Sequence, residues 1–449
     1  MFACTKCDAQ FSKWAGRCTE CGAWGTVIED VGAIHESPSS RSSSTALPGK
    51  TQSFAALTSS ESSTHRPTGL PVWDRILSGG CVPGSVTLLG GEPGIGKSTL
   101  LAQLGLTVSG QGKRVLYVTG EESPAQVALR LRRLSPTLPP TLEFLEENRA
   151  DVIASTIENK KPDLTIIDSI QTVRLPDVSG EAGNASQLKA CAATLTEAAK
   201  RSHAPIVLVG QVTKDGDLAG PKLVEHLVDT VLMMEGDRQQ SFRILRVLKH
   251  RFGATDELAV LHMTERGLEE VLDPSAALVA DRPKNVAGSI VTCLAQGSRP
   301  LLVEIQALVA PAGYGTPIRR GTGIDVNRLS LLLAVLGRRA GVSFGDQDVF
   351  VNVVGGIEAK EPATDLAICL ALASAKQDIP IPPQTIAWGE VGLSGEIRPV
   401  SNSGARLKEA TRLGFTTVIA PTGKIESPEN IQLISCSTMR EAIAALGKK

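Results

Sequence analysis

The chain has 449 residues, of which 42% are hydrophobic and 21% charged, and its formal net charge at pH 7 is −1. This length allows two or three domains with buried cores, and the charge excludes a strong overall attraction to nucleic acid, so any DNA contact must come from local patches or a ring channel. No apolar run approaches the 18 residues that a transmembrane helix needs, and MFACTKC lacks the features of a signal peptide, so we expect a cytoplasmic protein without membrane contact.

Four of the nine cysteines lie near the amino terminus, as Cys4-x-x-Cys7 and, after ten further residues, Cys18-x-x-Cys21. Paired thiolates at this spacing are typical of a tetrahedral Zn²⁺ site. Four thiolates leave no open coordination position, so we expect one structural zinc ion per chain rather than a catalytic one. Two disulfides are the alternative, and the scattered positions of the other five cysteines disfavour it.

The expected zinc module, residues 1–30, is too short for a core of its own, so metal binding and folding are expected to be one event. Its aromatic residues Phe11, Trp14 and Trp24 can stack on bases or contact a protein, and the sequence leaves both open. Residues 35–64 then contain eleven serines and almost no large apolar side chains. This composition predicts a flexible linker over residues 31–66.

The sequence GEPGIGKS at residues 91–98 fits the phosphate-binding pattern G-x-x-x-x-G-K-[ST]. Residues 85–91 before it have the apolar run of a buried strand, and residues 98–110 after it have the apolar spacing of a helix. Backbone N–H groups of such a loop bind phosphates at a helix N-terminus. We expect ATP to be bound by Gly91, Glu92, Pro93, Gly94, Ile95, Gly96, Lys97, Ser98 and Thr99.

Within this loop, Lys97 is expected to reach the β- and γ-phosphates as a point charge. The hydroxyl of Ser98, with Thr99 beside it, suits Mg²⁺. The motif therefore predicts a nucleotide-binding protein that uses ATP and Mg²⁺.

Three further apolar segments, at residues 115–123, 163–169 and 205–214, are predicted to be strands of the same sheet. The first delivers Glu121 and Glu122 to a loop, where one of them can orient and deprotonate the attacking water. The second ends in Asp168, a carboxylate suited to holding the Mg²⁺ hydration shell. The third places Gln211 at its carboxyl end, where ligands of open α/β sheets bind. The alternation of strands and helices predicts a doubly wound, mostly parallel sheet in a P-loop ATPase domain over residues 67–272.

Four segments resemble the RadA family, also called Sms, of bacterial DNA repair and recombination ATPases; they are residues 68–99, 117–123, 212–237 and 249–253. The resemblance extends over nearly the whole chain. It implies a RecA-like motor that forms a homo-oligomeric, hexameric ring, similar to DnaB-type helicases, and branch-migrates recombination intermediates. The implied partners are single-stranded and branched DNA and a RecA-type recombinase. It also implies that Glu121 is the catalytic glutamate.

The last of these segments, KHRFG at residues 249–253, places Lys249 and Arg251 two positions apart on an extended chain, so that both point to the same side. They can form a fork toward a γ-phosphate across a subunit boundary, as an arginine finger does. An exposed basic turn is the alternative, and the family resemblance favours the finger. This chain has His250 where the family usually has asparagine, and Gln211 where a histidine is frequent.

Residues 273–449 resemble the proteolytic domain of Lon, a mixed α/β fold with a serine nucleophile activated by a lysine, most clearly at residues 389–399. At the position of the Lon serine this chain has Ala363-Thr364-Asp365, and at that of the lysine it has Gly404. Lys408 lies about one helical turn beyond the required place. Since the two groups of such a dyad must be in hydrogen-bond contact, we expect no peptidase activity.

This third domain is therefore expected to support ring assembly and DNA contact, through basic stretches such as Arg319-Arg320 and Arg338-Arg339, although each pair is also compatible with an ordinary solvated surface. Three functions remain: a DNA-dependent ATPase motor for repair and homologous recombination, an ATP-dependent protease, and a nucleotide-switched assembly protein resembling KaiC. The missing dyad argues against the protease. The cysteine module together with KHRFG favours the DNA-dependent ATPase.

Overall fold

The computed structural model describes residues 2–7, 9–29, 65–211, 221–236, 242–295, 300–313, 316–423 and 428–446. The chain divides into two compact units, Met1–Ser62 and Ser63–Lys449. Of the linker expected over residues 31–66, only His65 and Arg66 belong to the described residues. No helix in the described part of the chain is long and apolar enough to cross a membrane.

The first unit contains a small antiparallel sheet with the strand order β2-β1-β3. Its strands are β1 (Phe2–Cys4), β2 (Gln10–Phe11) and β3 (Val27–Glu29). The buried cluster of this unit consists of Cys4, Cys18 and Val27, with Phe11 packed against it. Two of its three buried members are thiols, so apolar burial alone contributes little to folding here.

The second unit begins with a nine-stranded sheet in the order β12-β11-β10-β9-β4-β8-β7-β5-β6. Six strands are parallel: β4 (Val86–Gly91), β5 (Val115–Thr119), β6 (Leu142–Glu146), β7 (Leu164–Ile167), β8 (Ile206–Val209) and β9 (Thr230–Glu235). Three antiparallel strands extend it: β10 (Phe242–His250), β11 (Leu258–Thr264) and β12 (Gly267–Glu270). The predicted mostly parallel sheet is confirmed.

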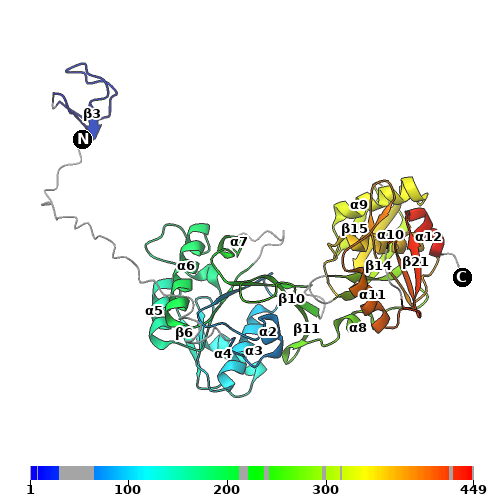
Figure 1. Cartoon of the computed structure of the whole chain (residues 1–449). Coiled ribbons are helices and arrows are strands. Elements are labelled where there is room, and N and C mark those ends of the chain that lie inside the picture. The colour runs from blue at the N-terminus through cyan, green and yellow to red at the C-terminus, as the bar shows by residue number, and fades with distance from the viewer. Residues whose placement is uncertain are drawn as a thin grey trace, which may run out of the picture. The chain divides into compact units, whose positions relative to one another are not determined.

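Helices cover both faces of this sheet (Figure 1). Its principal helices are α3 (Lys97–Gly110), α4 (Pro124–Leu134), α5 (Ala150–Lys160) and α6 (Ala185–Ser202), and the short helices are α2 (Pro71–Ile76), α7 (Pro221–Val224) and the 3₁₀ turn η1 (Ile170–Thr172). Apolar residues of α3 and α4 pack with Leu89 of β4, whereas those of α5 and α6 pack with Leu88. Because neighbouring strand residues face opposite sides, this division confirms a doubly wound fold.

The three strands predicted at residues 115–123, 163–169 and 205–214 are all shorter in the structure, since β5 ends at Thr119, β7 at Ile167 and β8 at Val209. The segment expected to be extended over residues 205–214 forms β8 only from Ile206 to Val209. The buried apolar run ends there, and the exposed Gln211 already belongs to the loop that follows. Residues 212–220 lie outside the described part of the chain.

The carboxy-terminal part has a seven-stranded mixed sheet in the order β15-β16-β14-β13-β17-β20-β21 and a separate pair β18-β19. The strands are β13 (Ser289–Leu294), β14 (Leu301–Pro311), β15 (Arg319–Thr322), β16 (Gln347–Val353), β17 (Thr385–Ala387), β18 (Glu390–Val391), β19 (Ile397–Arg398), β20 (Thr417–Pro421) and β21 (Gln432–Cys436). This mixed arrangement confirms the predicted α/β class of the region.

The helices of this part are α8 (Pro274–Val279), α9 (Val326–Val335), which continues as the π-helical segment η2 (Leu336–Ala340), the 3₁₀ turn η3 (Pro362–Thr364), α10 (Asp365–Gln377), α11 (Ser403–Arg412) and α12 (Met439–Leu446). Helix α10 is the centre of the core, since every residue from Asp365 to Ser374 is buried. Its first residue, Asp365, is therefore a buried carboxylate that needs a partner. Arg328 of α9 provides it through an ion pair.

Candidate nucleotide and metal sites

The phosphate-binding loop connects the last residue of β4, Gly91, to the first residue of α3, Lys97. Both glycines at its ends are required by their surroundings. A Cβ atom on Gly91 would lie 2.6 Å from the carbonyl oxygen of Met234, and Gly96, the N-cap of α3, has a φ of 117°. Larger residues would clash at the first position and be strained at the second.

The N-terminus of α3 is suited to an anion. It has no side-chain capping hydrogen bond and no acidic residue in its first turn, so no carboxylate repels a bound phosphate there. Lys97 is only 6% exposed, and its Nζ donates to the carbonyl oxygens of Gly91 and Glu92 at 2.7 and 2.8 Å. Ser98 and Thr99 follow in the same first turn. The residues present therefore fit the triphosphate that the sequence motif predicts.

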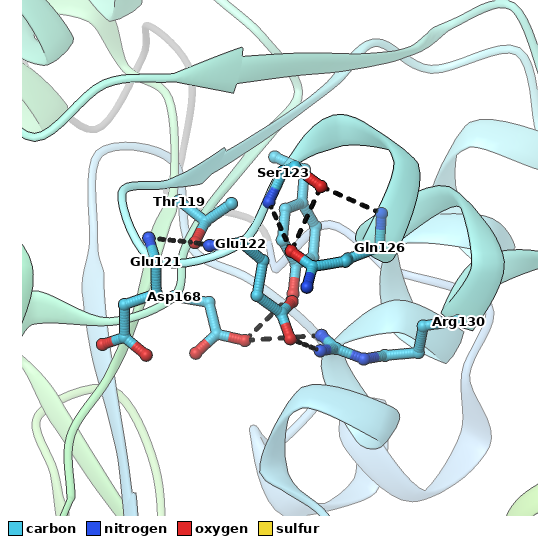
Figure 2. A network of polar contacts seen from close by, with 8 residues as sticks. Thr119, Glu121, Glu122, Ser123, Gln126, Arg130 and Asp168 are labelled. Carbon is cyan, nitrogen blue, oxygen red and sulfur yellow. Dashed lines mark hydrogen bonds and ion pairs between the residues drawn. The ribbon is translucent and has the colours of Figure 1, made fainter.

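The acidic residues gather beyond the carboxyl ends of β5 and β7, which are neighbours in the sheet (Figure 2). The hydroxyl of Thr119 accepts hydrogen bonds from the amides of Glu121 and Glu122 at 3.1 and 3.4 Å, which fixes the turn after β5. Glu121 accepts a hydrogen bond from the Ser169 hydroxyl at 2.9 Å. Asp168, directly after β7, is adjacent to that serine. The structure thus brings Glu121 and Asp168 together, as the sequence predicted.

Asp168 is held by a buried phenol. The hydroxyl of Tyr117 donates to Oδ2 of Asp168 at 3.0 Å. Burial raises the pKa of Tyr117 well above its usual value, and the nearby Asp168 carboxylate raises it further. The phenol therefore remains protonated and acts as a hydrogen-bond donor to the carboxylate at physiological pH.

Arg130 of α4 belongs to the same cluster, although the sequence did not single it out. Its guanidinium forms an ion pair with Glu122, and its Nη1 lies 3.9 Å from Oδ2 of Asp168 (Figure 2). The helix that carries it starts with a capping box, in which Ser123 and Gln126 exchange hydrogen bonds between side chain and backbone. The pattern S-x-x-Q was a readable signal for the start of this helix. The position of Arg130 eight residues after Glu122 was not a signal by itself.

Gln211 lies beyond the carboxyl end of β8, which pairs with both β4 and β7. It is exposed, and its backbone carbonyl accepts a hydrogen bond from the side chain of Gln171 at 3.4 Å. The structure therefore places Gln211 at the same edge of the sheet as Lys97 and Asp168.

Lys249 and Arg251 lie at the opposite edge of the sheet, where the parallel strands begin. Strand β10 is antiparallel to β9, and its last residue, His250, pairs with Thr230 at the start of β9. The amide of Arg251 donates to the backbone carbonyl oxygen of Asp229. The amide of Asp229 in turn donates to the carbonyl oxygen of Val86 at the start of β4. The phosphate-binding loop begins at the opposite end of β4, roughly 16 Å away along the strand. The structure does not bring these two cations to the loop of their own chain.

The two side chains do point to one side, toward residues 225–229. Lys249 Nζ donates to the carbonyl oxygens of Glu225 and Val228 at 2.6 and 2.8 Å. Arg251 forms an ion pair with Asp229 at 3.1 Å. Burial lowers the pKa of Lys249, and the neighbouring Arg251 lowers it further.

The amino-terminal cysteines form the metal-binding geometry that their spacing predicts. Their four Sγ atoms lie within 4.8 Å of one another, with 3.7 Å between Cys4 and Cys21 and 3.6 Å between Cys7 and Cys18. A tetrahedron with Zn–S bonds of about 2.3 Å has edges of about 3.8 Å, whereas a disulfide requires about 2.05 Å. The thiols therefore fit a closed Zn²⁺ site and not two disulfides. Trp14 and Trp24 are 65% and 76% exposed on this unit.

In the carboxy-terminal domain, the hydroxyl of Thr364 donates to the carbonyl oxygen of Glu361 at 2.8 Å. Gly404 and Lys408 are both exposed on α11. Between them, the fully buried Arg406 forms an ion pair with Glu361 and donates to backbone carbonyls of Cys293 and Ser401. A buried arginine with these partners is a structural element that the sequence comparison with Lon did not reveal. Within the described residues, the Thr364 hydroxyl donates to the Glu361 carbonyl and not to a basic side chain.

Of the two arginine pairs expected to be basic stretches, one residue makes hydrogen bonds within the fold and the other three are exposed. Arg319 donates to the backbone carbonyls of Phe344 and Gln347, whereas Arg320 is exposed on β15. Arg338 and Arg339 are both exposed in the π-helical segment.

Comparison with known proteins gives three matching family models: an AAA domain over residues 60–217, subunit ChlI of Mg-chelatase over residues 332–424, and a rubredoxin metal binding domain over residues 2–29. The first covers the phosphate-binding loop and the acidic cluster. The third covers all four amino-terminal cysteines, which supports the metal site found in the structure.

Curated relatives match over nearly the full chain. The DNA repair protein RadA of Bacillus subtilis (strain 168) is 44% identical over 448 residues, covering 98% of this chain and 97% of that protein. The DNA repair protein RadA of Pseudomonas aeruginosa is 45% identical over 451 residues, covering 99% and 98%. Among solved structures, the KaiC-like protein PH0186 from Pyrococcus horikoshii OT3 covers 47% of this chain and 100% of its own, at 17% identity and a TM-score of 0.40.

Proposed function

Because this chain belongs to the family of the DNA repair protein RadA, we propose that it is an ATPase that acts in DNA repair and homologous recombination and is stimulated by DNA. The observation that carries the proposal is the arrangement at one edge of the sheet. There, the N-terminus of α3, with Lys97, shares an edge with the carboxylates of Glu121 and Asp168. This is the set of groups that nucleotide hydrolysis requires.

We assign the roles as follows. The backbone of residues 91–96 and the ammonium of Lys97 hold the phosphates, with Gln211 at the same edge. The Ser98 hydroxyl and the Asp168 carboxylate would hold Mg²⁺ and its hydration shell, and the ion supplies positive charge that stabilises the phosphoryl oxygens. Glu121 orients the attacking water and accepts its proton.

The finer proposal is a hexameric, DnaB-like ring in the cytoplasm that branch-migrates recombination intermediates, binding single-stranded and branched DNA and a RecA-type recombinase. The position of Lys249 and Arg251, away from their own loop, supports an assembly in which they serve a neighbouring subunit. We further propose functional divisions at residues 1–30, 31–66, 67–272 and 273–449, with one structural Zn²⁺ in the first and no peptidase activity in the last.

The test is the rate of ATP hydrolysis by the full chain with and without single-stranded DNA. We expect DNA to stimulate turnover, and Lys97→Ala to reduce it at least a hundredfold, because the phosphate charge loses its buried cation. Lys200→Ala, an exposed lysine on α6, is the matched control and should change the rate less than twofold. Turnover that depends on Lys97 but not on DNA would instead favour a nucleotide-switched assembly protein without nucleic acid.

A further inference from the structure

Arg130 is the cation among three carboxylates at the proposed hydrolysis site. It pairs with Glu122, and its Nη1 lies 3.9 Å from Oδ2 of Asp168 (Figure 2). That nitrogen is buried and makes no hydrogen bond within the described structure. The side chain is 22% exposed, so its charge is only partly screened by water.

The fold determines where this guanidinium lies. The capping box of Ser123 and Gln126 sets the first turn of α4, and Val127 and Leu131 bury the helix face against the core. Side chains of a helix lean toward its N-terminus, so the long side chain of Arg130 reaches back over two turns to the start of the helix. Glu122 precedes the N-cap and therefore lies within its reach.

The two adjacent glutamates consequently have different environments. The Glu121 carboxylate accepts a hydrogen bond from Ser169, the residue next to Asp168. The Glu122 carboxylate points away from it, toward Arg130 (Figure 2). A carboxylate paired with a guanidinium is held away from the attacking water and is a poor ligand for Mg²⁺, since the pair already neutralises its charge.

We propose that Arg130 is a positioning residue for the ATPase reaction, which withdraws Glu122 from the magnesium and water positions by ion pairing. Glu121 then remains as the single base, and Asp168 as the single carboxylate available to the hydration shell of Mg²⁺. Arg130 also balances the charge of Asp168, whose Oδ2 is held by Tyr117. The inference rests on the ATPase function proposed above.

Removal of the Arg130 charge should strengthen Mg²⁺ binding and slow ATP turnover. Without Arg130, the cluster has more net negative charge, so Mg²⁺ is attracted more strongly, but the released Glu122 competes with Asp168 for it. We expect Arg130→Ala to lower the Mg²⁺ concentration for half-maximal binding of the fluorescent nucleotide mant-ADP at least threefold, and to reduce the turnover number at least tenfold. A merely structural role would not move these two quantities in opposite directions.

The second variant tests whether the released Glu122 causes the loss of ATP turnover in Arg130→Ala. Glu122→Gln in the Arg130→Ala background removes the released charge, so turnover should recover to within about threefold of the single Glu122→Gln variant, and the Mg²⁺ dependence should return toward that of the wild type. Arg130→Lys keeps the charge and should retain intermediate turnover. Arg133→Ala, an exposed arginine on the same helix, should leave both measurements within twofold.

The carboxylates themselves complete the test. Glu121→Gln should abolish turnover while mant-ADP binding persists, whereas Glu122→Gln should cost less than fivefold. The proposal is overturned if the double variant Arg130→Ala, Glu122→Gln stays as slow as Arg130→Ala, or if Glu122→Gln is as inactive as Glu121→Gln. Failure of the ATPase function itself would appear differently, as a wild-type chain without Lys97-dependent ATP turnover, whereas failure of the Arg130 proposal leaves wild-type turnover intact.

Discussion

Arg251 forms an ion pair with Asp229 at the start of β9, and the same carboxylate accepts a hydrogen bond from the amide of Val86 at 3.0 Å. Asp229 is buried, while the Arg251 side chain is 51% exposed. The pair therefore anchors KHRFG to the amino edge of its own sheet and leaves the guanidinium accessible. The phosphate-binding loop of the same chain begins at the opposite end of β4, so contact between Arg251 and a nucleotide would require the site of another subunit.

Action between subunits predicts complementation in mixed assemblies. Subunits with Arg251→Ala keep Lys97, and subunits with Lys97→Ala keep Arg251, so mixing them rebuilds some interfaces with both residues intact. We expect ATP turnover to rise above that of either variant alone. The control partner is the double variant Lys97→Ala, Arg251→Ala, which cannot rebuild such an interface. No recovery at any ratio, despite verified co-assembly, would reduce KHRFG to a structural or DNA-contacting turn.

The thiol tetrahedron predicts about one Zn²⁺ per chain, measurable by elemental analysis. Cys18→Ser should release the metal and unfold residues 2–29, because the buried cluster among the described residues of this unit consists of two thiols and Val27. ATP turnover without DNA should change little, since Lys97, Glu121 and Asp168 all belong to the second compact unit. Cys191→Ser, in the core of the second unit, is the control and should retain zinc. Zinc-free protein with normal folding of residues 2–29 would contradict the assignment.

The carboxy-terminal domain should show no peptide hydrolysis, with or without ATP. Thr364→Ala removes the hydrogen bond to the Glu361 carbonyl and a buried methyl group, so it should cost about 2 kcal/mol of stability and change no activity. Arg406→Ala leaves Glu361 without its buried partner and should cost about 3–5 kcal/mol. Casein degradation assays and thermal unfolding measure both effects. Casein cleavage that disappears in Thr364→Ala would contradict a loss of peptidase chemistry.

The sequence predicted the parts of the site whose chemistry follows from short spacing. The pattern located the phosphate-binding loop by its glycines at 91 and 96, and it located Glu121 and Asp168 by the apolar runs before them. The loop and the two carboxylates lie at one edge of the sheet. The contacts of Arg130 could not be read in this way, because α4 carries three arginines and only the fold determines which one reaches back. Likewise, the position of Lys249 at the opposite edge depends on the antiparallel pairing of β10 with β9, which no local pattern specified.

His250 gives a prediction for stability at acidic pH. Its Nδ1 lies 2.9 Å from the Thr230 hydroxyl, its Nε2 is buried without a hydrogen-bond partner within the described structure, and burial lowers its pKa. In the unfolded chain the pKa is about 6.5. As the pH falls below that value, the unfolded state takes up a proton that the folded state does not, so the native state loses stability until the pH reaches the lower folded pKa.

We therefore expect His250→Asn, whose amide does not take up a proton in this range, to reduce the drop in melting temperature between pH 7.5 and pH 5.5. The gain is limited to about 1.4 kcal/mol for each pH unit between the two pKa values. His203→Asn is the matched control, since His203 is exposed at the C-cap of α6 in a left-handed conformation that asparagine tolerates. Equal pH dependence of unfolding in the wild type and in His250→Asn would show that His250 is protonated as readily in the folded chain as in the unfolded one.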